Sequence, residues 1–278
     1  MLIESALYVV ATPIGNLSDM TPRAIEVLRN VDRVAAEDTR HSRLLFNHFS
    51  INTTLVAYHD HSEAAVAQRL LGEVERGASL ALISDAGTPL ISDPGYRLVS
   101  MAHELGIKTV PVPGASAVVA ALSVSGLPAD RFSFEGFIPS KSGARLRFLQ
   151  ALADESRTMI FYEAPHRISE SLCAMCEAFG DVRLATVARE LSKTFETVRR
   201  GCLKELATWV AADSNQQRGE IVVLVSGREK SEAKIDASVE RSLLLLAAEL
   251  PARRAAALTG EIYGISKNQL YRRLLELR

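Results

Sequence analysis

Charged side chains gather where two apolar, strand-like runs of the sequence end. The run 33–36 is followed by Asp38 and Arg40, and the run 184–188 is followed by Glu190 and Lys193. Because ligands of open α/β sheets bind at the carboxyl ends of the strands, these groups are candidates for acid–base and electrostatic chemistry. A loop held together by salt bridges is the alternative interpretation.

A longer loop, 84–95, follows the apolar run 80–83 and reads SDAGTPLISDPG. Its pairs of Asp, Gly and Pro cannot continue a strand or begin a long helix, so they predict a shaped loop at a strand's carboxyl end. That is the position of a ligand site. An ordinary turn rich in turn-forming residues is the alternative.

The turn TPIGN at 12–16 carries Gly15, and Asp38 follows it at roughly the 20-residue spacing of a dinucleotide fingerprint. That fingerprint needs three spaced glycines so that the backbone can approach a pyrophosphate, and this turn has one. A binding site for a nicotinamide cofactor is therefore the less favoured interpretation of this turn.

Two further clusters have the residue types of a metal or redox site. His59, Asp60 and His61 could bind a metal, but in an extended segment Asp60 would face away from the two imidazoles, so a polar loop is favoured and no metal is expected. Cys173 and Cys176 have the spacing of a redox pair. They lie within a helical pattern rather than at its start, where the helix dipole would lower a thiol pKa.

Basic side chains concentrate in two segments that could contact nucleic acid. The loop 139–147 holds three cations and no acidic residue, and 251–278 holds six Lys and Arg against two Glu. The second segment has helical patterns at 251–262 and 266–277 around a glycine turn, which is typical of a helix-turn-helix. A solvated loop and a helical hairpin that packs on the body are the alternatives.

The overall composition indicates the number of domains and the compartment of the protein. The chain has 278 residues, a net charge of −1 and three cysteines. Its length predicts two compact domains plus an extension, and its charge requires any RNA contact to come from local basic patches. The cysteine count favours a reducing compartment, and the amino terminus has neither a signal-like leader nor an apolar run that could span a membrane. We therefore expect a cytoplasmic protein with no membrane partner.

Strand-like runs alternate with helical patterns over the whole body. The runs 6–11, 33–36, 80–83 and 108–112 predict a parallel sheet in the first half. The second half holds strand-like runs at 132–138, 158–162, 184–188 and 219–225. These patterns predict α/β domains at 1–114 and 115–227, followed at 228–278 by a charged linker, 228–241, and a small helical appendage.

Seven motifs in order carry a resemblance that covers nearly the whole chain. They are TPIGNL, EDTR, SDAGTPLISDPG, PVPGAS, SGLP at 125–128, YEAPHR and RELSKTFE. Together they resemble the ribosomal-RNA-modifying branch of the tetrapyrrole-methylase-like, class III S-adenosylmethionine methyltransferases. The resemblance implies two α/β domains with S-adenosyl-L-methionine in the cleft between them, a homodimer, and 2′-O-methylation of a cytidine in the decoding region of small-subunit ribosomal RNA.

The resemblance also implies site residues. The cofactor would contact Pro13, Ser84, Asp85, Ala86, Gly87, Thr88, Pro89, Leu90, Gly114, Ala115, Ser116, Phe161, Tyr162, Ala188 and Arg189. Ser116 would also cap a helix whose free N–H groups suit a carboxylate. Gln216-Gln217-Arg218 departs from the family pattern, which leaves a contact at 219–221 open.

Methyl transfer to a ribose requires an aligned hydroxyl and help with its deprotonation. Asp38, Arg40, Glu190 and Lys193 are the expected catalytic groups. Expected RNA contacts are Asn16, Lys141, Arg145, Arg147, Arg253, Arg254, Lys267, Arg272 and Arg273, with ribosomal RNA or the small subunit as partner. A tetrapyrrole methyltransferase and a helix-turn-helix regulator are the alternatives, and the basic appendage favours RNA because a small planar substrate does not need it.

Overall fold

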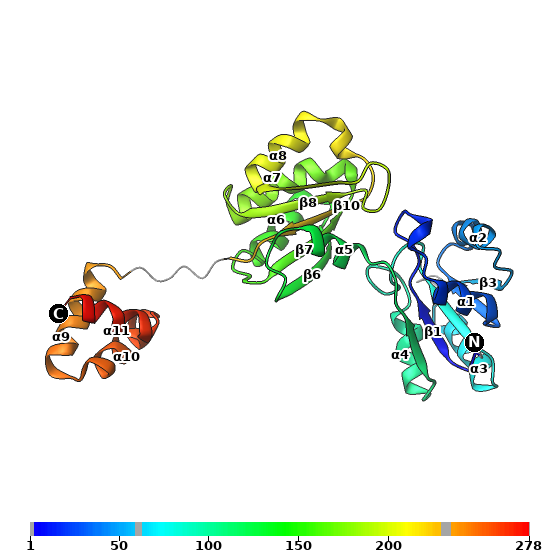
Figure 1. Ribbon diagram of the computed structural model, residues 1–278, viewed down its shortest axis with the longest axis horizontal. Coiled ribbons are helices and arrows are strands. Elements are labelled where there is room, and N and C mark those ends of the chain that lie inside the picture. Colours follow the sequence, from blue (N-terminus) through cyan, green and yellow to red (C-terminus); the bar gives the residue numbers. More distant parts are fainter. Residues whose placement is uncertain (1–2, 59–62, 229–234, 278) are drawn as a thin grey trace. The chain divides into compact units, whose positions relative to one another are not determined.

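A computed structural model describes residues 3–58, 63–228 and 235–277 of the chain. The chain divides into two compact units, Met1–Arg228 and Glu229–Arg278. Within the described residues of the first unit, the strands form two five-stranded sheets, with orders β3-β2-β4-β1-β5 and β6-β7-β10-β8-β9 (Figure 1).

The first half of this unit alternates strand and helix, as the sequence patterns predict. The structure adds a helix at Thr39–His48 and a strand at Thr54–Ala57 that were not among the predicted elements. Every strand pairing in its sheet is parallel, and Leu7 of β1 lies opposite Leu80 of β4 and Thr109 of β5. The elements are β1 (Leu7–Val10), η1 (Leu17–Asp19), α1 (Pro22–Asn30), β2 (Arg33–Ala36), α2 (Thr39–His48), β3 (Thr54–Ala57), α3 (Glu63–Glu75), β4 (Leu80–Ile83), α4 (Tyr96–Glu104) and β5 (Thr109–Val112).

Helices cover both faces of this sheet because its central strands β1 and β4 are apolar on both sides. Val27 of α1 and Phe46 of α2 pack in one core cluster with Tyr8. Leu70 of α3 and Leu98 of α4 pack in another cluster on the opposite face. A doubly covered parallel sheet leaves its strand ends and the loops that follow them free to form a site.

The second half forms a mixed sheet. Strands β6 and β7 are parallel, while β10 is antiparallel to both β7 and β8, and β8 is antiparallel to β9. The elements are α5 (Ala117–Val124), β6 (Phe132–Phe137), α6 (Ser142–Ala151), β7 (Thr158–Glu163), η2 (Pro165–Arg167), α7 (Ile168–Phe179), β8 (Leu184–Arg189), β9 (Thr197–Cys202), α8 (Leu203–Ala212), η3 (Ser214–Gln217) and β10 (Ile221–Val225).

The second sheet is also covered on both faces. Helices α6, α7 and α8 pack on one face around Phe161 and Val223, and α5 packs on the other through Val118 and Leu122. The edge strand β9 was not among the predicted elements, because its sequence TVRRGC lacks an apolar run.

The second unit consists of helices α9 (Ala237–Glu249), α10 (Ala252–Tyr263) and α11 (Lys267–Glu276) around a core that includes Leu243 and Leu270. Gly264 ends α10 in the left-handed conformation, as expected of the turn in a helix-turn-helix. Helix α9 begins inside the segment predicted as linker, because the carboxylate of Asp236 caps it by accepting hydrogen bonds from the N–H groups of Ser238 and Val239. No helix in the described part of the chain is long and apolar enough to cross a membrane.

Candidate active site

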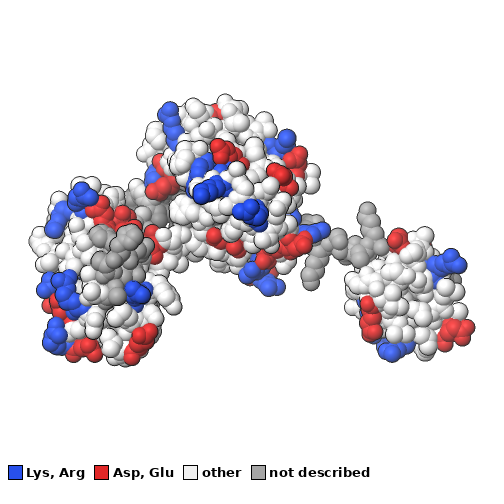
Figure 2. Space-filling view, turned by 180° about the vertical axis from the view of Figure 1, so that it is seen from behind, with Lys and Arg blue, Asp and Glu red and all other residues white. Residues whose placement is uncertain are grey.

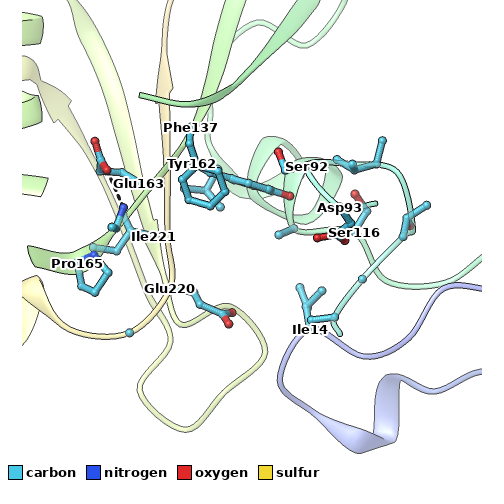
Figure 3. A pocket seen from close by; sticks show the side chains of 18 residues that line it. Ile14, Ser92, Asp93, Ser116, Phe137, Tyr162, Glu163, Pro165, Glu220 and Ile221 are labelled. Carbon is cyan, nitrogen blue, oxygen red and sulfur yellow. Dashed lines mark hydrogen bonds between the residues drawn. The ribbon is translucent and has the colours of Figure 1, made fainter. Parts of the chain in front are cut away.

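A cavity of about 360 Å³ lies in the first unit, at the carboxyl end of β4 (Figure 3). Segments far apart in the sequence line it: the loop after β4, the amino end of α5, the end of β7 and the start of β10. The lining residues are Ile14, Ala86, Gly87, Thr88, Ile91, Ser92, Asp93, Ser116, Ala117, Phe137, Tyr162, Glu163, Ala164, Pro165, Gly219, Glu220, Ile221 and Val222.

The loop 84–95 is held in place by backbone hydrogen bonds. Gly87 and Thr12 exchange both of their backbone hydrogen bonds, at 2.8 and 3.0 Å. The Thr88 hydroxyl donates to the carbonyl of Ala115 at 3.0 Å. Gly87 has φ +81°, and a Cβ there would lie 3.3 Å from Cγ2 of Ile14. A glycine is therefore required where three segments of the cavity wall meet.

Asp93 brings a half-buried carboxylate to the cavity. Burial raises the pKa of Asp93, the charge of Asp85 adds to the rise, and a hydrogen bond with Ser84 opposes it. Within the residues that the structure describes, no cation forms an ion pair with Asp93. An unneutralised carboxylate in such a setting suits a cationic ligand group.

Tyr162 projects across the cavity toward Ser92, Asp93 and Ser116 (Figure 3). Burial raises the pKa of Tyr162 to about 12, the charges of Asp93 and Glu220 contribute, and a hydrogen bond with the backbone of Val118 opposes the rise. The ring of Phe137 lies 5.5 Å from that of Tyr162, centroid to centroid. This side of the cavity is thus aromatic and uncharged.

The amino end of α5 forms another part of the wall. Ser116 stands at the cap position, as predicted, but its side chain makes no capping hydrogen bond. Both Ser116 and Ala117 line the cavity. The helix end therefore presents a partial positive charge suited to an anionic group.

Ala164 and Pro165 of the YEAPHR motif line the cavity, and the buried carboxylate of Glu163 holds this turn in place. Glu163 accepts hydrogen bonds from the backbone N–H of Ala164 at 2.7 Å and from the Ser171 hydroxyl, and it pairs with Arg167 at 2.8 Å. A buried charge with these partners is fully compensated and fixes the turn.

A second cavity, of about 320 Å³, adjoins the first and shares Ile14, Ala86 and Glu220 with it. Its lining combines polar groups with three leucines. The lining residues are Thr12, Pro13, Ile14, Gly15, Leu17, His41, Ser42, Leu44, Leu45, Ser84, Asp85, Ala86, Lys193 and Glu220.

Lys193 reaches this second cavity from the loop after β8. Its ammonium pairs with Glu190 at 2.8 Å and with Glu220 at 3.1 Å. Burial opposes the charged form, but the two carboxylates prevail and raise the pKa of Lys193, so it stays protonated at neutral pH. A methyl group on Gly15 would overlap the aliphatic chain of Lys193, and one on Gly219 would overlap the carboxyl of Glu190. The two glycines therefore make room for the pair.

The structure brings Glu190 and Lys193 together but gives Asp38 and Arg40 a different setting. Asp38 caps α2 by accepting a hydrogen bond from the N–H of Arg40 at 2.8 Å, and this bond is the main cause that lowers the pKa of Asp38. Its own N–H donates to Asp85 at 3.1 Å. The Arg40 side chain is 93% exposed.

Most residues expected to bind the cofactor border one of these cavities or a neighbouring one. Pro13, Ser84, Asp85, Ala86, Gly87, Thr88, Ser116 and Tyr162 line the two cavities described, and Gly114 and Ala115 line a third hollow beside Ser116. Pro89, Leu90, Phe161, Ala188 and Arg189 line none of these. Side chains alternate along β7, so Tyr162 faces the cavity while Phe161 is buried against Leu172 and Met175. Arg189 is buried and donates to the carbonyls of Arg218 and Phe195.

The sequence interpretation did not include several lining residues. Asp93, Phe137 and Glu163 are the chemically distinctive ones, and Glu220 lies in the contact at 219–221 that the sequence left open. The SDPG turn at 92–95 and the YEAPHR motif were the available indications for Asp93 and Glu163.

The basic residues expected to contact RNA differ in their surroundings. Lys141, Arg147, Arg253, Arg254, Lys267 and Arg272 are exposed. Arg145 is buried, pairs with Glu170 at 2.9 Å and donates to the carbonyl of Ser140, and Arg273 pairs with Glu240 at 2.5 Å. Asn16 accepts a hydrogen bond from the N–H of Ser18. Basic and acidic residues are interspersed on the face in Figure 2, in keeping with the net charge.

The structure adds no support for a metal site at 59–61 or for a redox pair at Cys173 and Cys176. His59, Asp60 and His61 lie outside the described residues, and among those described no three His, Cys, Asp or Glu side chains could hold a metal ion together. Cys173 and Cys176 lie within α7. Burial, with the charge of Asp181, raises the pKa of Cys176 to about 11, the opposite of an activated thiol.

Comparisons with known proteins agree with the fold and the motifs. Residues 6–207 match the family model of tetrapyrrole (corrin/porphyrin) methylases, and residues 233–278 match that of the RsmI C-terminal HTH domain. The chain is 58% identical to the ribosomal RNA small subunit methyltransferase I of Pseudomonas aeruginosa, covering 97% of this chain and 96% of that protein. It is 50% identical to the protein of that name from Escherichia coli O157:H7, covering 98% and 96%.

Solved structures share the fold at low sequence identity. Uroporphyrin-III-C-methyltransferase from Thermus thermophilus has a TM-score of 0.55 and 21% identity, covering 79% of this chain and 93% of that one. A diphthine synthase has a TM-score of 0.58 and 16% identity, covering 79% and 89%. The chain therefore belongs to the tetrapyrrole methylase family and, within it, to the ribosomal RNA small subunit methyltransferase I family.

Proposed function

We propose that the chain uses S-adenosyl-L-methionine to methylate the ribose 2′-oxygen of a cytidine in the decoding region of small-subunit ribosomal RNA. The relatives' names give the substrate class. The observation that carries the proposal is a pair of adjoining cavities, one with the groups to hold the cofactor and one with a protonated lysine beside two carboxylates. The proposal keeps the expectations of a homodimer and of a cytoplasmic location.

The larger cavity fits the cofactor in size and in chemistry. S-adenosylmethionine carries an ammonium, a carboxylate, a sulfonium and a purine, and a cavity of about 360 Å³ is in the range of small-molecule sites. Asp93, half-buried and without an ion pair among the described residues, would hold the ammonium. The amino end of α5 at Ser116 would hold the carboxylate. Phe137 and Tyr162 would contact the purine.

The bound cofactor supplies an activated methyl group, so the chain has to position and deprotonate the acceptor hydroxyl. Lys193 is protonated and lines the second cavity, where it would stabilise negative charge that develops on the ribose oxygen. Asp85 lines the same cavity and forms no ion pair within the described residues, so it is the carboxylate that we propose accepts the proton.

The other expected catalytic groups take supporting roles in this proposal. Glu190 orients Lys193 at 2.8 Å. Asp38 caps α2 and donates its N–H to Asp85, so it positions that carboxylate. Arg40, exposed beside it, would contact a phosphate.

The second unit would recruit the substrate. Its exposed cations Arg253, Arg254, Lys267 and Arg272 lie on α10 and α11, in the segment that matches a helix-turn-helix family model. Contacts from these residues to phosphates would give affinity that depends on salt.

Mapping 2′-O-methylation in small-subunit ribosomal RNA from cells with and without this protein tests the proposal. We expect one cytidine in the decoding region to lose its 2′-O-methyl group when the protein is absent, and to regain it with wild-type protein. An unchanged map, with tetrapyrrole products altered instead, would favour the tetrapyrrole methyltransferase.

A further inference from the structure

Helix α2 carries an apolar stripe that faces the second cavity. Leu44 and Leu45 line that cavity, with His41 one turn before them on the same helix face, whereas Phe46 is buried in the core of the first sheet. Leu17 of η1 lines the same cavity. Leu44 is 69% exposed and Leu17 is 41% exposed, so the described residues leave this wall open to solvent.

The same helix is cationic. Within Thr39–His48 the sequence has Arg40, Arg43, His41 and His48, and it has no acidic residue. Arg40 and Arg43 are both exposed. An apolar wall flanked by exposed arginines is complementary to a nucleotide, which presents a flat base and an anionic phosphate.

A buried polar atom at the cavity also supports a nucleotide ligand. Ser42 lines the cavity and is 3% exposed, and its hydroxyl has no hydrogen-bond partner among the described residues. Buried hydroxyls are normally paired, so this one is available to a ligand.

The polar part of the cavity lining suits a ribose. Asp85, Lys193 and Glu220 line it, and Ile14, Ala86 and Glu220 also line the larger cavity. The carboxylates of Asp85 and Glu220 would repel a phosphate but accept hydrogen bonds from sugar hydroxyls. A nucleotide with its ribose beside Ile14, Ala86 and Glu220 would have that ribose next to the larger cavity, and its phosphates would remain on the exposed side, where Arg40 and Arg43 lie.

We infer that the second cavity is the acceptor-nucleotide site, with Leu17, Leu44 and Leu45 contacting the base and Arg40 and Arg43 the adjacent phosphates. The inference rests on the proposed function, which it deepens by naming the residues that receive the substrate base. It assigns α2 a role in selecting the nucleotide.

Leu44→Ala tests the apolar wall, with Leu105→Ala as the matched control. Leu105 is 45% exposed and lines none of the cavities described. Loss of the apolar contact between the Leu44 side chain and the base is expected to lower kcat/KM for ribosomal RNA by about ten-fold, while the Kd for S-adenosylmethionine stays within about two-fold. Leu105→Ala should match wild type in both measurements. Arg43→Ala should reduce the slope of log affinity against log salt by about 0.7 to 0.9.

Methyl NMR of the full chain separates failure of the site from failure of the proposed function. On addition of a short single-stranded oligoribonucleotide with a central cytidine, we expect the methyl resonances of Leu17, Leu44 and Leu45 to shift and those of Leu105 to stay in place. If these shifts occur but wild-type protein does not methylate ribosomal RNA, the site stands and the proposed function fails. If wild-type protein is active, Leu44→Ala matches it and the shifts are absent, the inference is overturned. A Leu44→Ala loss that extends equally to cofactor affinity would also overturn it.

Discussion

Replacing Asp93 with Asn should change cofactor affinity and protein stability in opposite directions. The two side chains have nearly the same shape, so the cavity keeps its volume while it loses a negative charge. Burial raises the pKa of Asp93, which means that the folded, cofactor-free protein holds this carboxylate at a cost. Any stability linked to it is present below the unfolded-state pKa and is lost as the pH rises through the folded-state pKa. The neutral amide that Asp93→Asn introduces should therefore raise the Tm of the free protein at pH 7.

The same substitution should weaken cofactor binding. A hydrogen bond between charged groups contributes about 1.5–3 kcal/mol, so its loss predicts a Kd for S-adenosylmethionine that is higher by about 10- to 100-fold. In wild-type protein the affinity should also fall as the pH drops toward the raised pKa of Asp93, because the protonated carboxyl no longer attracts the ammonium. Asp93→Asn should abolish that part of the pH dependence.

Isothermal titration calorimetry between pH 5 and 8, with thermal unfolding of the free proteins, measures both effects. Asp130→Asn is the matched control, because Asp130 is exposed and lines none of the cavities described. A Kd for Asp93→Asn within two-fold of wild type at pH 7, in a protein of normal fold, would refute the assignment of Asp93 to the cofactor ammonium.

The remaining predictions concern the loop, the chemistry and the second unit. Gly87→Val should weaken S-adenosylmethionine binding at least about ten-fold by calorimetry and destabilise the fold by about 1–3 kcal/mol, because φ at Gly87 is +81° and its Cβ would crowd Ile14; wild-type affinity would remove the loop from the site. Asp85→Asn should lower single-turnover methylation by about 10²–10⁴-fold with cofactor affinity retained, and an unchanged rate would contradict its role as proton acceptor. Lys193→Met should lower the same rate by about 10²–10³-fold and Glu190→Gln by less, since Glu190 only orients the ammonium; the reverse order would make Glu190 the catalytic group. Ending the chain at Arg228 should leave cofactor binding intact and reduce both RNA affinity and its salt dependence, whereas unaltered RNA binding would assign the second unit another role, such as dimer assembly, which sedimentation would detect.

Periodicity and turn chemistry predicted most of the fold, but not the edge strands β3 and β9 or helix α2. Continuous apolar runs such as 80–83 and 221–225 are too short for a buried helix and indicate strands buried on both faces, and the alternation with helical patterns indicates helices over those faces. The sequence pattern did not predict the edge strand β9, because Arg199 and Arg200 face solvent or a neighbouring side chain. An edge strand needs no apolar face of its own.

The candidate site was predictable in outline but not in detail. The sequence indicated a ligand loop at 84–95, but positive φ angles at Leu90 and Ser92 turn the chain so that Asp93 returns to the cavity. These conformations are uncommon for residues with a side chain, so residue type does not reveal them. Likewise, alternation along β7 requires Phe161 and Tyr162 to point to opposite faces, but only the packing of α7 determines which of them is buried.

Methyl transfer by the purified full-length protein tests the central claim most directly. The protein would be incubated with methyl-labelled S-adenosylmethionine and small ribosomal subunits or their RNA, and the RNA digested to nucleosides for mass spectrometry. We predict that the label appears as 2′-O-methylcytidine from one position in the decoding region, and that Asp85→Asn greatly reduces it. Label on a base rather than a ribose, or transfer to a tetrapyrrole and none to RNA, would contradict the account.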